Sequence, residues 1–330
     1  MKKSSAQLCS CLLLLITLIS AGCQKSADTH QERDEIRQEV IASLKGEILF
    51  SNYSSIYKAS AKSGGTATLM GTNVHLDVRQ KWSTDGLKIA YIKATELVND
   101  CYLVIADKNG LIQHEWLLGN FSSLSPLRDL TWAPDDQIIA VLAKNKIIYC
   151  TVASGNLTNH QLVPTPGFAF SSIAWWPKGN KIALAEGMET IFTSQDYNNY
   201  IWMLEAYEKD PHQAPSHLLV TNSDPSLFRI HHLDWSKDGM MLTYSEDGMG
   251  SIYTVHSDGT GNQKITSKPP LKEKAVYGFA PSWMPDNQQI VYVGVKGVSG
   301  STLIFGLFVT DLHGTYNVAL NITGRNPDCY

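Results

Sequence analysis

The chain has 330 residues, of which 43% are hydrophobic and 18% charged, and its formal net charge is −4. This composition is globular and excludes the intrinsically disordered class. It also argues against a nucleic-acid-binding protein, because such a surface needs a basic domain.

Residues 1–22 have the pattern of a signal peptide. Lys2 and Lys3 give a positive start, and an apolar run follows from 12 to 19. The run is shorter than the roughly 20 residues of a membrane span and fits the core of a signal peptide. Removing this segment takes away both lysines, so the formal charge of the remaining chain is about −6.

The end of this segment, Ser20-Ala21-Gly22-Cys23, resembles the lipobox of bacterial lipoproteins. The resemblance implies cleavage before Cys23, diacylation of its thiol and acylation of the new amino terminus. Gln24, rather than Asp, implies the outer membrane of a Gram-negative envelope, facing the periplasm. The alternative is an ordinary secretory signal in which Cys23 has no role.

Three cysteines remain beyond the lipobox: Cys101, Cys150 and Cys329. An odd number, spread over the whole chain, does not look like a disulfide framework. We expect all three to be buried thiols on strands.

Residues 23–45 are predicted to form a lipidated tether and a short helix. Ile36, Val40, Ile41 and Leu44 fall on one helical face, and Gly46 is a good stop signal. We expect this face to dock on the rim of the following domain, and a partner-binding helix is the alternative.

A strand–turn–strand unit centred on a tryptophan recurs five times within residues 46–330. The units start their turns at Trp82, Trp132, Trp175, Trp235 and Trp283. Turn residues such as Pro, Asp, Gly and Asn follow each tryptophan, and two further short β runs complete each repeat. Repeats of this length with four short strands are typical of β-propeller blades. The regular place of the tryptophans predicts packing between blades rather than ligand stacking.

The run at 82–91, Trp-Ser-x-Asp-Gly-x-x-Ile-Ala-Tyr, resembles the WD40-like repeats of TolB-type β-propellers. The resemblance covers about residues 46–330 and implies the fold without implying an activity. TolB-type proteins are periplasmic partners in an envelope-spanning complex and carry an α/β domain before the propeller. Residues 24–45 leave no room for that domain, so the resemblance extends to the propeller only.

The two ends of the repeat region predict how the ring closes. Residues 47–50, 55–58 and 67–70 read as a blade without its first strand, and residues 324–330 read as a first strand without its tryptophan. We expect the last strand to complete the first blade, which removes exposed sheet edges. The prediction is an all-β, six-bladed propeller. Seven blades is the alternative, if the connection at 205–230 contains another one.

No sequence motif of a catalytic or metal site stands out, such as His-Glu-x-x-His, a phosphate loop or Gly-x-Ser-x-Gly. Ser55 and Lys58 have Ser-x-x-Lys spacing, but a strand points them to opposite faces. Residues 258–262 lack the spaced carboxylates of a calcium loop. We therefore expect no cofactor and no metal.

Charged residues in the loops before the first strands predict a partner-binding rim at one mouth of the channel. They are Arg79, Arg128, Asp129, His231, His232 and Arg325. Such a ring can bind an acidic segment or an anionic ligand, and a solvent-lined funnel without a ligand is the alternative. Adjacent strand residues face opposite ways, so His231 and His232 are not expected to share a metal.

The sequence favours a monomeric, lipid-anchored envelope protein that binds other proteins through its propeller. A lyase or hydrolase acting on an envelope glycan or peptide is one alternative, and a small-ligand sensor is another. The polar, aromatic insertions at 186–199 and 205–229 are either functional loops or decoration. Fold alone does not decide among these functions.

Overall fold

The computed structural model describes residues 31, 34–62, 66–74, 79–94, 100–121, 127–143, 145–188, 199–207, 210–211, 217–222, 229–246, 250–266, 278–299 and 302–330. The predicted signal peptide and Cys23 lie outside these residues. The chain separates into two units, which meet between Ser43 and Leu44. In the first unit, positions 31 and 34–43 are helical. Among the described residues, no helix is both long and apolar enough to cross a membrane.

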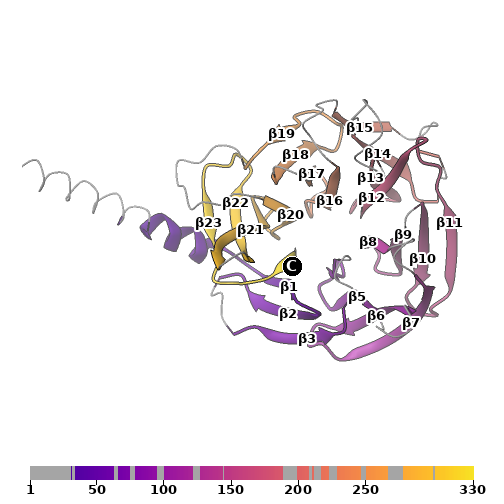
Figure 1. The fold of residues 1–330 in the computed structure, drawn as a ribbon, viewed down its shortest axis with the longest axis horizontal. Helices are drawn as coiled ribbons and strands as arrows, with labels where there is room; N and C mark the ends of the chain where they lie inside the picture. Colours follow the sequence, from indigo (N-terminus) through magenta and orange to yellow (C-terminus); the bar gives the residue numbers. More distant parts are fainter. Residues whose placement is uncertain are drawn as a thin grey trace, which may run out of the picture. The chain divides into compact units, whose positions relative to one another are not determined.

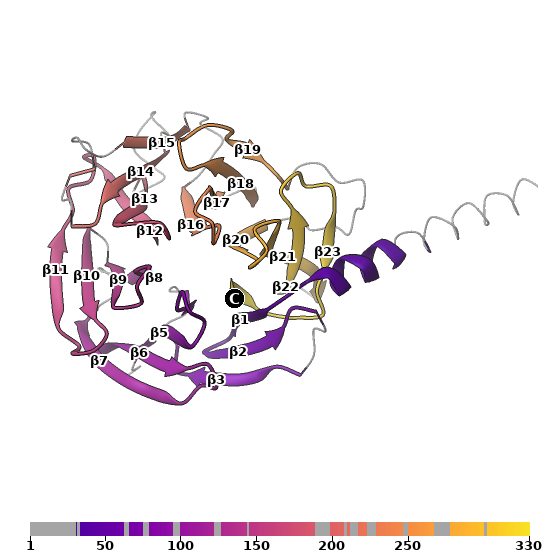
Figure 2. The same cartoon turned by 180° about the vertical axis from the view of Figure 1, so that it is seen from behind.

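The second unit is a ring of blades, each a four-stranded antiparallel sheet (Figures 1 and 2). Blade 1 contains β24 (Arg325–Cys329), β1 (Glu47–Asn52), β2 (Ser55–Ser60) and β3 (Thr68–Thr72). Blade 2 contains β4 (Lys81–Trp82), β5 (Lys88–Ala94), β6 (Asp100–Asp107) and β7 (Ile112–Asn120). Blade 3 contains β8 (Leu127–Trp132), β9 (Ile138–Ala143), β10 (Lys146–Thr151) and β11 (Leu157–Gln161).

The other half of the ring has the same plan. Blade 4 contains β12 (Phe168–Trp175), β13 (Lys181–Met188), β14 (Asn199–Glu205) and β15 (His217–Asn222). Blade 5 contains β16 (Ile230–Trp235), β17 (Met241–Glu246), β18 (Ser251–His256) and β19 (Gln263–Lys264). Blade 6 contains β20 (Gly278–Trp283), β21 (Gln289–Ser299), β22 (Thr302–Asp311) and β23 (Asn317–Ala319).

The predicted six-bladed propeller is confirmed over the described part of the chain. The seven-bladed alternative is wrong, because the described residues between 205 and 229 supply only β15, the fourth strand of blade 4. The ring closes as predicted. β24 pairs antiparallel with β1, with Leu49 opposite Asp328. Glu47 and Tyr330 extend the pairing through two backbone hydrogen bonds of 2.6 and 2.9 Å.

The side chain of Tyr330 fastens blade 1 to the first turn of blade 2. Its hydroxyl donates to the carbonyl of Asp85 at 2.7 Å, and its ring lies 6.0 Å from that of Trp82. Gly86 has a φ of +67° and a Cβ there would overlap the tyrosine ring. The glycine of this turn is therefore needed both for its backbone conformation and for space.

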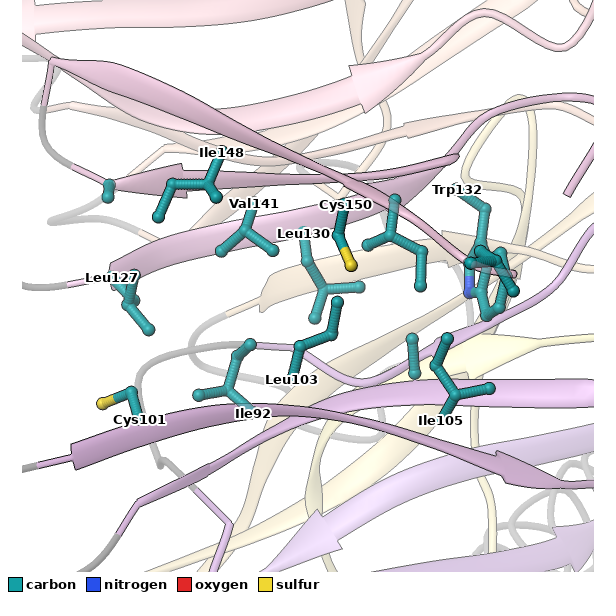
Figure 3. Packing of buried hydrophobic residues seen from close by; sticks show 14 residues of the cluster. Ile92, Cys101, Leu103, Ile105, Leu127, Leu130, Trp132, Val141, Ile148 and Cys150 are labelled. Carbon is teal, nitrogen blue, oxygen red and sulfur yellow. The ribbon is translucent and has the colours of Figure 1, made fainter. Parts of the chain in front are cut away.

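The hydrophobic core lies between neighbouring blades. Figure 3 shows the interface of blades 2 and 3, where Ile92 and Leu103 face Leu130 and Val141. Cys101 and Cys150 are buried residues of this cluster and Cys329 is a buried residue of β24, and these three cysteines form no disulfide. Burial raises the pKa of the Cys150 thiol to about 11. The three cysteines are thus core residues, as the sequence predicts.

The tryptophans of the repeats pack between blades. The five are only 1–6% exposed. Three of their indole N–H groups donate to a carbonyl of the preceding blade: Trp132 to Lys81 at 3.2 Å, Trp235 to Ala174 at 3.3 Å and Trp283 to Asp234 at 3.1 Å. These bonds fix the spacing of adjacent first strands.

Candidate binding site in the central channel

The first strands of neighbouring blades contact one another around the channel. Each first strand begins after the loop that links two blades and ends at the tryptophan turn. We call the end with the turns the tryptophan mouth, and the end where the first strands begin the loop mouth. The polar groups between the two mouths are the candidate site.

A buried ion pair joins the neighbouring blades 2 and 3 near the loop mouth. The guanidinium of Arg79, which is 2% exposed, contacts the carboxylate of Asp129 through Nη2–Oδ2 at 2.9 Å and Nε–Oδ1 at 3.3 Å. Nη2 also donates to the carbonyl of Leu233 in the opposite blade 5 at 2.7 Å. Burial opposes the charge of Arg79, but attraction to Asp129 outweighs it and raises the pKa of Arg79.

Asp129 extends this network to blade 4. Its Oδ2 accepts a 2.5 Å hydrogen bond from the Ser172 hydroxyl, which in turn accepts the backbone N–H of Leu233 at 2.9 Å. Arg79 and Asp129 therefore face the interior and pair with each other. Neither side chain is therefore part of the surface that a partner could bind at the loop mouth.

A second buried network lies near the tryptophan mouth. The ammonium of Lys81 contacts Asp234 Oδ1 at 2.6 Å and Asp328 Oδ1 at 2.8 Å. Lys81 belongs to blade 2, Asp234 to the opposite blade 5, and Asp328 to the closing strand β24. Asp328 Oδ2 also accepts the backbone N–H of Trp82 at 2.6 Å, and Asp234 Oδ2 accepts that of Trp283 at 2.8 Å. The lysine thus joins three blades at one point.

The protonation of this cluster follows from burial and charge. Burial opposes the charge of Lys81, but attraction to Asp234 and Asp328 outweighs it and raises its pKa. Burial also opposes the negative charge of Asp234, but attraction to Lys81 and Arg79 outweighs this effect and lowers the pKa of Asp234. For Asp328 burial and the nearby Asp234 prevail, so its pKa is raised. Lys81 stays protonated at neutral pH, which is unfavourable for a nucleophile or a general base.

A cavity of about 80 Å³ opens at the tryptophan mouth beside this cluster. Its polar lining includes Lys81, Asp234 and Asp328. Its other walls include tryptophans and prolines of four blades: Trp82, Trp132, Trp175, Trp235, Pro134 and Pro177. Lys237, in the turn of blade 5, also lines it. Side chains of five blades therefore converge on one opening.

The remaining residues of the predicted rim lie at the loop mouth. Arg128, His231 and His232 are half-buried, and Arg325 is exposed. The guanidinium carbon of Arg325 lies 4.1 Å from the ring centroid of Phe305, so its plane is supported by an aromatic side chain. The four are first-strand residues of blades 1, 3 and 5.

The two histidines do not point apart as a regular strand would require. The pairing of β16 with β17 shifts register between His231 and Asp234, and His232 has a φ of +56°. This bulge brings the imidazole centroids to 5.7 Å, with His232 Nδ1 at 3.1 Å from Ser245 Oγ. No group of three or more His, Cys, Asp or Glu side chains could hold a metal ion within the described residues.

Sequence reasoning missed the Lys81 cluster. Its signal is a charged residue directly before the tryptophan position of a first strand, at Lys81, Asp234 and Asp328. Trp82 Nε1 and Arg79 Nη1 are buried and have no hydrogen-bond partner in the structure. Most of the insertions at 186–199 and 205–229 lie outside the described residues.

Comparison with known proteins supports the fold. The sequence matches no family model and no curated protein. Among solved structures, a chain of the nidogen/laminin complex is similar over 86% of this chain and 97% of its own length, with 10% identity and a TM-score of 0.60. A putative TolB from Agrobacterium tumefaciens is similar over 85% of this chain and 79% of its own, with 14% identity and a TM-score of 0.39. The first of these supports the propeller fold alone.

Proposed function

We propose that this chain is a lipid-anchored protein of the bacterial envelope whose propeller binds an acidic segment of another protein at the loop mouth. The lipobox-like Ser20-Ala21-Gly22-Cys23 supports the anchor, and Gln24 supports the outer membrane. The propeller supplies a rigid scaffold, because its first strands are joined by buried ion pairs.

The observation that carries the proposed binding site is the cationic surface of the loop mouth. Arg128 and Arg325 come from distant parts of the sequence; Arg128 is half-buried and Arg325 is exposed, and both lie on first strands, as the two histidines do. The stacking of Arg325 on Phe305 orders its guanidinium before a partner arrives. An ordered guanidinium can hold a carboxylate through two parallel hydrogen bonds with less loss of entropy than a free one.

Replacing Arg128 and Arg325 with Ser should weaken binding of the partner mainly through a slower association rate. Arg79 is kept in this variant, because breaking its buried pair with Asp129 would cost about 3–5 kcal/mol of stability. The partner is first recovered from crosslinked envelopes. Its association rate is then measured from about 50 to about 500 mM salt, since surface charges are screened over about 8 Å at physiological ionic strength.

The matched control is the Lys178→Ser and Lys237→Ser double variant, which removes the same charge from exposed positions in the tryptophan turns. We expect the control to keep the wild-type salt slope and the loop-mouth variant to lose part of it. Equal association rates and equal salt slopes for all three proteins would contradict the proposed binding site at the loop mouth.

Lipidation at Cys23 is tested by mass spectrometry of the mature protein isolated from membranes. We expect a chain that starts at residue 23 and carries the mass of its acyl groups, because small residues precede the cysteine after an apolar core. Two anchoring signals or several acyl chains are needed for stable attachment, at about 0.8 kcal/mol per buried CH₂. A Cys23→Ser variant should be released from the membrane. An unmodified mature terminus at another residue would contradict the anchor.

A further inference from the structure

We propose that the cavity at the tryptophan mouth is a second binding site, for a neutral, hydroxyl-rich ligand of the carbohydrate class. It lies at the opposite end of the channel from the loop mouth, and the two share no residue. With a volume of about 80 Å³, it has room for several waters or for the hydroxyl-bearing edge of a larger molecule.

The charges around the cavity favour a neutral ligand. Lys81 and Lys237 supply two positive charges, and Asp234 and Asp328 supply two negative ones. An anion entering the cavity would meet the two carboxylates, and a cation would meet the two ammonium groups. A hydroxyl group avoids both penalties, since it donates to a carboxylate oxygen and accepts from an ammonium.

The lining also holds hydrogen-bond donors that the protein does not satisfy. The indole N–H of Trp82 is buried without a partner, whereas its equivalents in Trp132 and Trp235 donate to carbonyls of the preceding blade. Lys81 contacts two carboxylate oxygens, so one of its three N–H bonds remains. Buried donors are normally satisfied by a protein group or by ordered water, so an unsatisfied donor in a cavity wall marks a position that a ligand hydroxyl could fill.

The remaining walls suit the apolar part of a sugar ring. Indole and pyrrolidine groups line the opening around the polar cluster. Sugar rings carry C–H groups on their faces and hydroxyls at their edges, and this distribution matches an apolar wall around a polar centre. The cavity thus offers donors, acceptors and apolar contacts without a net charge.

The test is a titration of the full chain with glucose, galactose and N-acetylglucosamine, followed by intrinsic tryptophan fluorescence and ligand-observed NMR. Glucuronate and glucosamine serve as the anionic and cationic analogues. We expect saturable binding of at least one neutral sugar, and weaker binding of both charged analogues.

The Trp82→Phe variant should weaken binding about tenfold at most, because it removes the unsatisfied N–H and keeps a ring. The matched control is Trp132→Phe, whose N–H already donates to Lys81, and it should change affinity less than Trp82→Phe does. Thr84→Val, at an exposed position of the lining, is a second variant that should weaken binding even if Trp82→Phe does not fold.

Two results would overturn the proposal. One is the lack of saturable binding by any neutral sugar, which leaves ordered water as the occupant. The other is tighter binding of glucuronate or glucosamine than of the neutral sugars. The loop-mouth variant should bind sugar like the wild type, so this result is independent of the proposed protein partner.

Discussion

Deletion of residues 324–330 should abolish the cooperative unfolding transition of the propeller or shift it to much lower denaturant. The deletion removes β24, leaves an edge of β1 unpaired and opens the ring. It also removes Asp328 from Lys81 and from the backbone N–H of Trp82. Breaking such a buried pair costs about 3–5 kcal/mol. The total free energy of unfolding of a domain is only about 5–15 kcal/mol. The loss of the buried pair together with the loss of the β1–β24 hydrogen bonds should therefore be enough to unfold the propeller.

The measurement is urea unfolding followed by circular dichroism and tryptophan fluorescence. The matched control is Cys329→Ala, which trims a buried side chain of β24 but keeps the strand and its backbone pairing. The control should unfold cooperatively with a modestly lower midpoint. A truncated protein with the wild-type midpoint would mean that β24 contributes nothing to ring closure.

Lys81→Met should destabilise the propeller by about 3–5 kcal/mol near neutral pH, because it leaves the buried carboxylate of Asp328 and the largely buried carboxylate of Asp234 without their cation. Lys81 Nζ lies 2.6 Å from Asp234 and 2.8 Å from Asp328, so no other group in the described residues replaces both contacts. Denaturant midpoints of the wild type and the variant, measured at the same pH, give the loss of stability. Lys237→Met is the control, since this exposed lysine lines the same cavity without an ion pair at that distance.

The loss should also depend on pH. The pKa of Asp234 is lowered in the folded protein, so its ionised form stabilises the fold above its unfolded pKa, and this contribution fades as pH falls. Asp328 has a raised pKa in the folded protein and acts in the opposite sense. Its protonated form stabilises the fold at low pH, and this contribution is lost as pH rises through the pKa of Asp328 in the folded protein. In Lys81→Met both carboxylates lack the cation and take up protons more readily.

The difference between wild type and Lys81→Met should therefore shrink from about pH 7 to about pH 4, near the unperturbed pKa of Asp. Lys81→Arg, which keeps the positive charge, should show a smaller difference with a weaker pH dependence. A Lys81→Met difference that is the same at both pH values would contradict the proposed electrostatic origin.

Local sequence signals were sufficient to predict the fold. A turn such as 83–86 places Gly or Asn where the backbone needs a positive φ, and the flanking β runs fix the strands on either side. Each blade is such a local unit, so its strands follow from nearby residues. The closure also followed from the sequence, because residues 324–330 lacked a partner at one end and residues 47–50 lacked one at the other.

The candidate site was harder to predict because its contacts join different blades, some of them on opposite sides of the channel. Nothing near Lys81 in the sequence indicates that its ammonium reaches Asp234, which lies across the channel and 153 positions away. Arg79 reads as a loop residue, yet the short β4 turns it inward onto Asp129. The histidine pair was misread for a different reason, since a single left-handed residue, His232, overrides the alternation of a regular strand.

The way in which the ring closes also determines when the fold can become stable. Ser51 donates to the carbonyl of Arg325, which is 274 positions further along the chain. In an open repeat array each unit contacts only its neighbours, so folding can start anywhere and spread. Here the pairing of β24 with β1 must close a loop of nearly the whole chain. The entropic cost of closing this loop arises before the stabilising contacts of the closed ring have formed. A folding intermediate in which only β24 is not yet paired therefore has all other strands formed and an unpaired edge at β1. We expect this late intermediate to reach the native state slowly and to be the species most prone to aggregate.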